Sequence, residues 1–179
     1  MLAEHRLHAS DLIWPLFICE GEGCEEPVES LPGVSRWSID KLPSRARLAA
    51  EAGIPRLALF PNTPGSLRSD DAREAVNPDN LICRAIKAIK DAVPDIGVLT
   101  DVALDPYTSH GHDGLTDARG CVANDETAKI LVEQALVQAR AGADIVAPSD
   151  MMDGRVGAIR SALAGESLCD VAFMAYAAK

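Results

Sequence analysis

This sequence has no surplus of basic residues and no long apolar run. Lysine and arginine number 17 against 27 aspartate and glutamate residues, which gives a formal net charge of −10 at pH 7. A nucleic-acid-binding surface must neutralise phosphates with cations, so this balance argues against a nucleic-acid partner. The longest apolar stretches, 12–19 and 171–178, fall well short of the roughly 20 residues that cross a bilayer. Neither a nucleic-acid-binding nor a membrane protein is expected.

Paired cysteines and a secretory signal are also missing. The five cysteines are an odd number at irregular spacing, which is typical of free thiols in a cytoplasmic protein rather than of a disulfide framework. The N-terminal "MLAEHRLHASD" carries charges and lacks the apolar centre of a signal peptide. We therefore expect a cytoplasmic protein.

The sequence contains apolar runs that alternate with amphipathic helical segments. The runs read as Val/Ile/Leu/Ala-rich strands buried on both faces, which indicates a parallel sheet built from strand–helix units. No glycine-rich nucleotide-binding motif follows the first of these strands, which weakens a nucleotide-binding interpretation. The expected strands are 55–61, 96–104, 143–150 and 171–179, and the expected helices are 38–53, 79–93, 124–142 and 153–165.

Two folds fit this alternation of strands and helices, an open doubly wound sheet and a (β/α)8 TIM barrel. Polar residues gather where the expected strands end, and a barrel collects functional residues at the carboxyl ends of its strands. A complete barrel needs about 250 residues, and this chain has 179. We predict a single domain over 1–179 that forms the N-terminal half of a barrel. It would comprise an arm and lead-in over 1–37 and about four βα units over 38–179.

Two of the strand-end residues suit covalent chemistry. Lys179 ends an apolar run, and a partly desolvated lysine has a lowered pKa and can attack a carbonyl. From position alone an ordinary solvated lysine at a chain end is the commoner explanation. Asp101 ends the second strand, where it would either face the barrel mouth or make a turn.

The loop "DVALDPYTSHGHDG" (101–114) adds further candidates. Asp105 and Asp113 supply hard oxygen ligands, which suit Mg²⁺ better than zinc. His110 and His112 are candidate proton carriers. In "PSDMMDGR" (148–155), Ser149 and Asp150 could hydrogen-bond a substrate or cap a helix.

Taken together, "DVALDPYTSHGHDG", "VAPSDMMDGRV" and "YAAK" resemble the porphobilinogen synthase family, also called the δ-aminolevulinate dehydratase family. "PGV.R.SID" near the N-terminus and "LFPNTP" resemble the same family. The resemblance extends from about Asp11 to Lys179. It implies a (β/α)8 barrel that condenses two molecules of 5-aminolevulinate into porphobilinogen with loss of two waters, in tetrapyrrole (haem) biosynthesis.

The resemblance also implies roles for particular residues. Lys179 matches a lysine that forms a Schiff base with substrate, with Ala177 standing where most members have serine. Asp101 and Ser149 match positions that face the first substrate, and Asp150 neighbours them. Zinc-dependent members carry three cysteines where this chain has Ala103, Asp105 and Asp113, so zinc is not expected there. The two aspartates either bind Mg²⁺ or line the pocket.

The same resemblance implies a second Schiff-base lysine and four further strands, which the 179 residues do not include. We therefore expect the piece by itself to be inactive and the full-length protein to be a homo-oligomer. Two rival interpretations are weighed beside this one. A class I aldolase shares the barrel and the lysine but has no use for "TSHGHDG". A non-catalytic half-barrel would need a partner chain.

Overall fold

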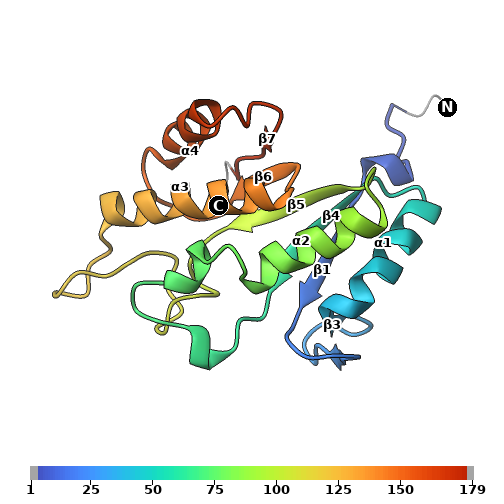
Figure 1. Ribbon diagram of the computed structural model, residues 1–179, viewed down its shortest axis with the longest axis horizontal. Helices are drawn as coiled ribbons and strands as arrows, with labels where there is room; N and C mark the ends of the chain where they lie inside the picture. The colour runs from blue at the N-terminus through green and yellow to red at the C-terminus, as the bar shows by residue number, and fades with distance from the viewer. Residues whose placement is uncertain (1–3, 177–179) are drawn as a thin grey trace.

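The computed structural model describes residues 4–176, which form one sheet with helices packed along it (Figure 1). Within that range the sheet order is β2-β3-β1-β4-β5-β6-β7. The strands are Ile13–Ile18 (β1), Glu25–Pro27 (β2), Ser35–Trp37 (β3), Arg56–Pro61 (β4), Gly97–Val102 (β5), Ile145–Pro148 (β6) and Ala172–Phe173 (β7). The α-helices are Leu42–Glu51 (α1), Leu81–Ala92 (α2), Asn124–Ala141 (α3) and Arg155–Gly165 (α4), and short 3-10 turns cover Ala9–Asp11, Ile39–Lys41, Gly65–Leu67 and Arg73–Val76.

The long strands are parallel, and each is followed by a helix. β1 pairs with β4, β4 with β5, β5 with β6 and β6 with β7, all in parallel, while β2 and β3 form an antiparallel hairpin beside the end of β1. Four strand–helix units result, as expected. The first one starts earlier than expected, because β1 lies inside the segment predicted to be an arm and pairs with β4 along its whole length. Its apolar and aromatic residues favour a half-buried strand.

Two apolar cores lie between the sheet and its helices. α1, α2 and α3 lie side by side along one face, and α4 packs against α3 (Figure 1). The first core joins β1, β4 and β5 to α1 and α2, and it includes Leu16, Leu57, Leu59, Ile82, Ile86, Ile89 and Val98. The second core joins β5 and β6 to α3 and α4, and it includes Val102, Tyr107, Leu131, Ala135, Val146, Ile159 and Leu163.

The opposite face of the sheet carries a cluster composed of strand residues only. We call it the helix-free face; its buried members are Ala58, Leu99, Ile145 and Ala147, with Ile13 and Phe60 beside them. Side chains alternate between the two faces of a strand, so Leu99 belongs to this face and Val98 to the first core. Helices on one face only are typical of a barrel, whereas a doubly wound sheet carries helices on both.

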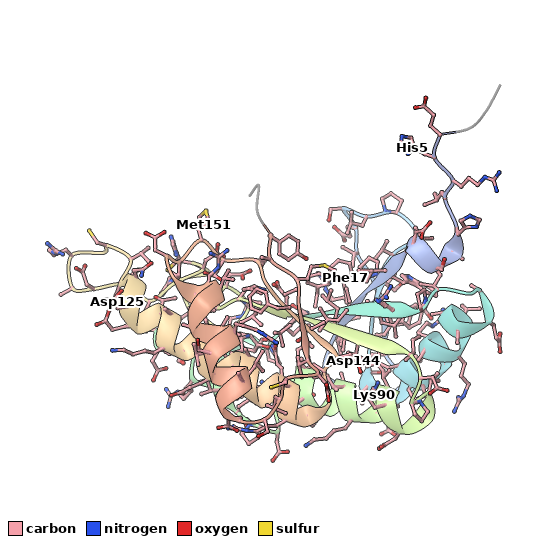
Figure 2. The ribbon with its side chains drawn as sticks, turned by 90° about the horizontal axis from the view of Figure 1, so that it is seen from above. His5, Phe17, Lys90, Asp125, Asp144 and Met151 are labelled. Carbon is pink, nitrogen blue, oxygen red and sulfur yellow. The ribbon has the colours of Figure 1, made fainter. Side chains whose placement is uncertain are left out.

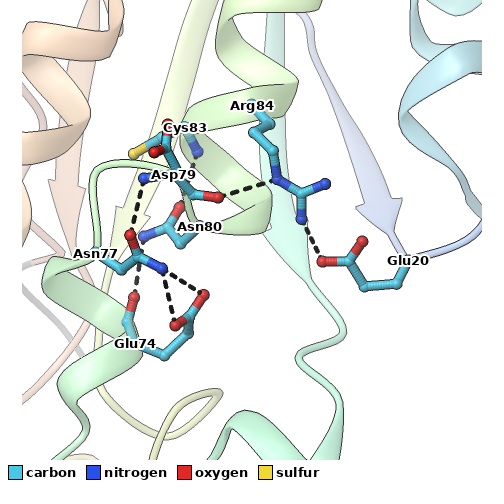
Figure 3. Close-up of polar contacts among 7 residues, drawn as sticks. All are labelled: Glu20, Glu74, Asn77, Asp79, Asn80, Cys83 and Arg84. Atoms are coloured by element: carbon cyan, nitrogen blue, oxygen red, sulfur yellow. Dashed lines mark hydrogen bonds and ion pairs between the residues drawn. The ribbon is translucent and has the colours of Figure 1, made fainter.

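Polar contacts fasten the helices at both ends of the sheet. At the carboxyl ends, the Asn80 side chain accepts from the Cys83 amide (2.9 Å) and so caps α2, while Arg84 pairs with Glu20 just after β1 (Figure 3). At the amino ends, Lys90 Nζ lies 2.9 Å from Asp144 Oδ2 (Figure 2). These contacts fix how α2 sits against β1 and β6.

The last strand is shorter than expected. The sequence predicts a strand over 171–179, whereas the described ladder of β7 comprises Ala172 and Phe173. The Met174 amide continues the pairing to the Val146 carbonyl at 3.0 Å. Among the helices seen between residues 4 and 176, none is long and apolar enough to cross a membrane.

Candidate active site

The carboxyl end of β5 places Asp101 on the helix-free face. The preceding residue, Thr100, is fully buried and donates its hydroxyl to Gln138 of α3 at 2.8 Å. Because successive side chains of a strand point to opposite faces, Asp101 projects away from the helices. Its carboxylate is half-buried. This is the geometry of a group facing into a barrel mouth.

Ser149 lies on the neighbouring strand end. Asp101 pairs with Ala147 of β6 in parallel register, so Ser149 follows two residues later and on the same side. Two polar residues predicted to contact substrate are therefore next to each other at one end of the sheet.

Tyr176 brings the C-terminal segment to the same place. Tyr176 follows β7, which pairs with β6 in parallel, so the chain reaches residue 176 at the carboxyl end of the sheet, beside the strand end that carries Ser149. Partial burial and the negative charge of Asp101 raise the pKa of the Tyr176 phenol. Tyr176 precedes Lys179 by three residues, and Lys179, the predicted nucleophile, lies outside the described residues.

The loop after β5 is anchored to the loop after β4. The Ser69 amide donates to the Tyr107 carbonyl (3.0 Å), the Ser109 amide donates to the Ser69 carbonyl (3.2 Å), and the Ser109 hydroxyl bonds the Asp70 carboxylate. Thr108 forms an isolated parallel bridge with Ser69. These bonds hold the segment that contains Asp105 and Asp113 over the carboxyl end of the sheet.

The two loop histidines are exposed and lie 6.4 Å apart between ring centroids. Nδ1 of His110 accepts from the His112 amide (3.2 Å), and Nδ1 of His112 accepts from the Gly114 amide (3.1 Å). An accepting Nδ1 leaves the proton of a neutral imidazole on Nε2. Both rings thus shape the turn and stay accessible to solvent.

The loop after β5 offers carboxylate oxygens from Asp105 and Asp113 and ring nitrogens from His110 and His112 as donors for a cation. Asp105 and Asp113 are half-buried carboxylates, and the nearest cysteine along the chain, Cys121, is exposed. Across the part of the chain that the structure covers, no three His, Cys, Asp or Glu side chains are gathered as a metal cage. Mg²⁺ is commonly held by one or two carboxylates with water completing its shell, whereas structural zinc needs four protein ligands.

Asp150, for which the sequence left open a substrate contact or a capping role, has its described contacts in the loop before α4 and at the first residue of that helix. Its side chain is fully buried, accepts from the Met152 amide at 2.7 Å and lies 2.9 Å from Nε of Arg155. Burial raises the pKa of the Asp150 carboxyl, although the Met152 amide and Arg155 act in the opposite direction. The ion pair joins the end of β6 to the first residue of α4, so Asp150 has the contacts of a residue that holds the loop.

Two buried glutamines of α3 were not predicted. Gln138 donates from Nε2 to the Asp101 carbonyl, and Gln134 donates from Nε2 to the Ala103 carbonyl, each at 3.0 Å. Both side chains are fully buried. In the sequence they read as ordinary polar helix residues, and the available signal is their four-residue spacing on the apolar side of the helix.

Comparison with known proteins gives a consistent result. The family model described as delta-aminolevulinic acid dehydratase matches residues 1–179. A delta-aminolevulinic acid dehydratase of Bradyrhizobium diazoefficiens is 57% identical over 179 residues, covering 100% of this chain and 50% of the relative. A chloroplastic one of Selaginella martensii is 49% identical over 178 residues, covering 98% of this chain and 42% of the relative.

A solved structure matches as well. The crystal structure of the Toxoplasma gondii delta-aminolevulinic acid dehydratase (porphobilinogen synthase), in complex with the reaction product porphobilinogen, superposes with a TM-score of 0.96. Its sequence is 47% identical, and the match covers 98% of this chain and 50% of that one. The chain thus spans about half the length of the relatives it matches, and the fold is that of half a (β/α)8 barrel.

Proposed function

We propose that this chain, which belongs to the delta-aminolevulinic acid dehydratase family, serves the condensation of two molecules of 5-aminolevulinate into porphobilinogen. Two waters leave in the reaction, one as the substrate ketone becomes an imine and one as the ring closes. Because the chain spans about half the length of its relatives, we assign the complete reaction to the complete gene product.

The observation that carries the proposal is the juxtaposition of Asp101, Ser149 and Tyr176. They come from the ends of β5, β6 and β7, which are neighbours in one parallel sheet, so an acid, a hydroxyl and a phenol lie at the same edge of that sheet. A barrel enzyme assembles its catalytic residues at this end. A Schiff-base reaction needs such a grouping, because the amine requires a nearby proton carrier.

In the proposed mechanism, neutral Lys179 attacks the ketone carbon of the first 5-aminolevulinate and forms a carbinolamine. Asp101 transfers the proton that lets the hydroxyl leave as water, and the protonated imine then withdraws electrons from the neighbouring carbon. Ser149 hydrogen-bonds the substrate. His110 and His112 are exposed enough to exchange protons with solvent.

Asp150 is assigned a positioning part in this proposal, in place of direct substrate contact, because its carboxylate faces Arg155 and the Met152 amide. Asp105 and Asp113 are the residues that would hold Mg²⁺. A bound divalent cation there would supply positive charge to orient substrate oxygens.

Borohydride trapping tests the proposal. The complete gene product is incubated with 5-aminolevulinate, reduced, digested and mapped by mass spectrometry. We expect the reduced adduct on the Lys179 peptide, and no adduct there in Lys179→Arg. Lys129→Arg, on the exposed side of α3, is the matched control and should keep the adduct. An unmodified Lys179 peptide in the folded wild-type protein would refute the assignment.

Location and assembly stay predictions. The cysteines are free thiols throughout, which supports the cytoplasm. The expected homo-oligomer can be checked by light scattering.

A further inference from the structure

Helix α3 presents two buried amides to the end of strand β5. Gln134 and Gln138 are four residues apart and therefore lie on one side of the helix. Both are fully buried. Burial of an amide is unfavourable unless the amide is hydrogen-bonded. Each of these two side chains donates to a backbone carbonyl at the end of β5.

The Gln138 amide accepts one hydrogen bond from β5 and donates another to it. The Thr100 hydroxyl donates to Oε1 of Gln138 at 2.8 Å, and Nε2 of Gln138 donates to the Asp101 carbonyl at 3.0 Å. The Asp101 carbonyl can only accept, so it fixes Nε2 as the end of the amide that donates, and the Thr100 hydroxyl donates to the oxygen at the other end. The amide is therefore held on both sides by consecutive residues of β5.

Gln134 repeats the contact one helical turn earlier. Its Nε2 donates to the Ala103 carbonyl, which lies just beyond the last residue of β5. Two residues of a strand advance by about 6.6 Å, and four residues of a helix by about 6 Å. The spacing of the two glutamines thus matches that of the two carbonyls. The two amides hold α3 to β5 at the point where the pairing of β5 with β6 ends.

We propose that Gln138 is a positioning residue for Asp101, with Thr100 holding Gln138 and Gln134 extending the grip to Ala103. By fixing the peptide group of Asp101 from the helix side, Gln138 sets the direction in which the carboxylate leaves the helix-free face. This inference rests on the proposed function, since it specifies how that same site is held.

A simple packing role does not account for these contacts. Between and beside the two glutamines the inner side of α3 carries aliphatic side chains, Leu131, Ala135 and Ala139. Hydrocarbon at position 138 would satisfy the core equally well. It would leave the Thr100 hydroxyl without its acceptor and the Asp101 carbonyl without this donor.

The test measures imine formation with Gln138→Met, which keeps length and removes both polar contacts. In the complete gene product, borohydride trapping at saturating 5-aminolevulinate gives a rate constant and a final amplitude. Displacement of a catalytic group by about 1 Å lowers rates on the order of a hundredfold, so we expect a ten- to hundredfold slower rate constant. The amplitude and the half-saturating substrate concentration should change less than twofold, since the folded fraction and substrate binding persist.

The matched control is Asn80→Ala, which removes another fully buried amide on a different helix and should leave the rate constant unchanged. A double-mutant cycle supplies the second readout. If Gln138 acts through Asp101, Gln138→Met has no further effect on the rate of Asp101→Ala. Thr100→Val should slow the reaction in the same direction by a smaller factor, and it serves if Gln138→Met does not fold.

The outcomes separate the two proposals. Wild-type protein that forms no imine refutes the proposed function and this inference with it. Imine formation in wild type at the same rate as in Gln138→Met or Thr100→Val overturns the positioning role alone. So does a rate loss that is fully additive with Asp101→Ala.

Discussion

The two cores beneath the helices differ in what they bury. The fully buried members of the first core, under α1 and α2, are aliphatic side chains, and the buried Asn80, next to Leu81 of that core, caps α2. Beside the second core, α3 carries Gln134 and Gln138, and the fully buried Asp150 pairs with Arg155. The same strand–helix unit is thus built in two ways within one sheet.

The difference follows from what lies at the carboxyl end of each strand. β4 and α2 are joined through a loop whose bonds serve to hold other loops, such as Ser69 to Tyr107. β5 and β6 lead to Asp101 and Ser149, which the proposed mechanism requires to point toward the substrate. Apolar packing is non-directional, whereas a hydrogen bond fixes an angle. We infer that the first core contributes stability, and that the second core contributes stability and also orients the side chains at the ends of β5 and β6.

The largest expected effect comes from breaking the buried ion pair. Asp150→Ala leaves the Arg155 guanidinium, which is 15% exposed, without its carboxylate. Removing one partner of a buried pair costs about 3–5 kcal/mol of unfolding free energy. Asp150→Asn retains an acceptor for the Met152 amide and should cost less. Urea unfolding measures both, and a loss below 1 kcal/mol in Asp150→Ala would show that the pair is not a structural support.

Asp150 should also make the stability of the protein depend on pH. Burial raises the pKa of Asp150 in the folded protein, so the folded state binds this proton more tightly than the unfolded state. The stability contribution of the group is therefore full below the unfolded pKa of about 3.9 and is lost as pH rises through the raised folded pKa. Relative to Asp150→Asn, wild type should lose stability as pH increases above about 4. A relative gain over that interval would contradict the sign.

The next prediction separates the unfolding free energy from the rate constant of imine formation. Ile86→Ala in the first core should cost roughly 2–5 kcal/mol and leave the imine rate constant of folded molecules unchanged. Its matched variant, Leu131→Ala in α3, should cost a similar amount and also slow the reaction, because α3 carries the two glutamines. Both side chains are fully buried. Equal effects of the two variants on the rate constant would abolish the distinction between the cores.

Periodicity and strand-end chemistry predict most of this fold. Continuous apolar runs indicate buried parallel strands, and the helix expected over 124–142 agrees with α3, whose C-cap is Gly142 with φ of 109°. The N-terminal strand was missed because a single apolar run before the first helix reads equally well as an arm. Its role depends on pairing with β4, a long-range contact that local pattern does not contain.

The candidate site is predictable only in part, for a related reason. The positions of Asp101 and Ser149 near the carboxyl ends of β5 and β6 follow from the sequence, because polar residues there mark where the apolar strands end. Asp150 occupies the same kind of position in the sequence, yet its carboxylate turns inward to Arg155. Gln134 and Gln138 look like surface residues of a helix until the sheet beneath them is known. Which polar side chain is buried depends on tertiary packing rather than on spacing.

The smallest expected effect leaves stability unchanged and tests whether the buried thiols are sealed from solvent. Burial raises the pKa of Cys83 to about 11 and also raises that of Cys19, whereas Cys121 and Cys169 are exposed. At pH 8 about one Cys83 in a thousand is a thiolate, and the thiolate is the reactive form. Iodoacetamide followed by peptide mapping should label Cys121 and Cys169 within minutes and leave Cys19 and Cys83 intact. Protein unfolded in urea, the control, should label at every cysteine. Labelling of folded Cys83 as fast as Cys121 would mean that the contact between α2 and α3, where Cys83 faces the Val137 carbonyl, opens as readily as the loops.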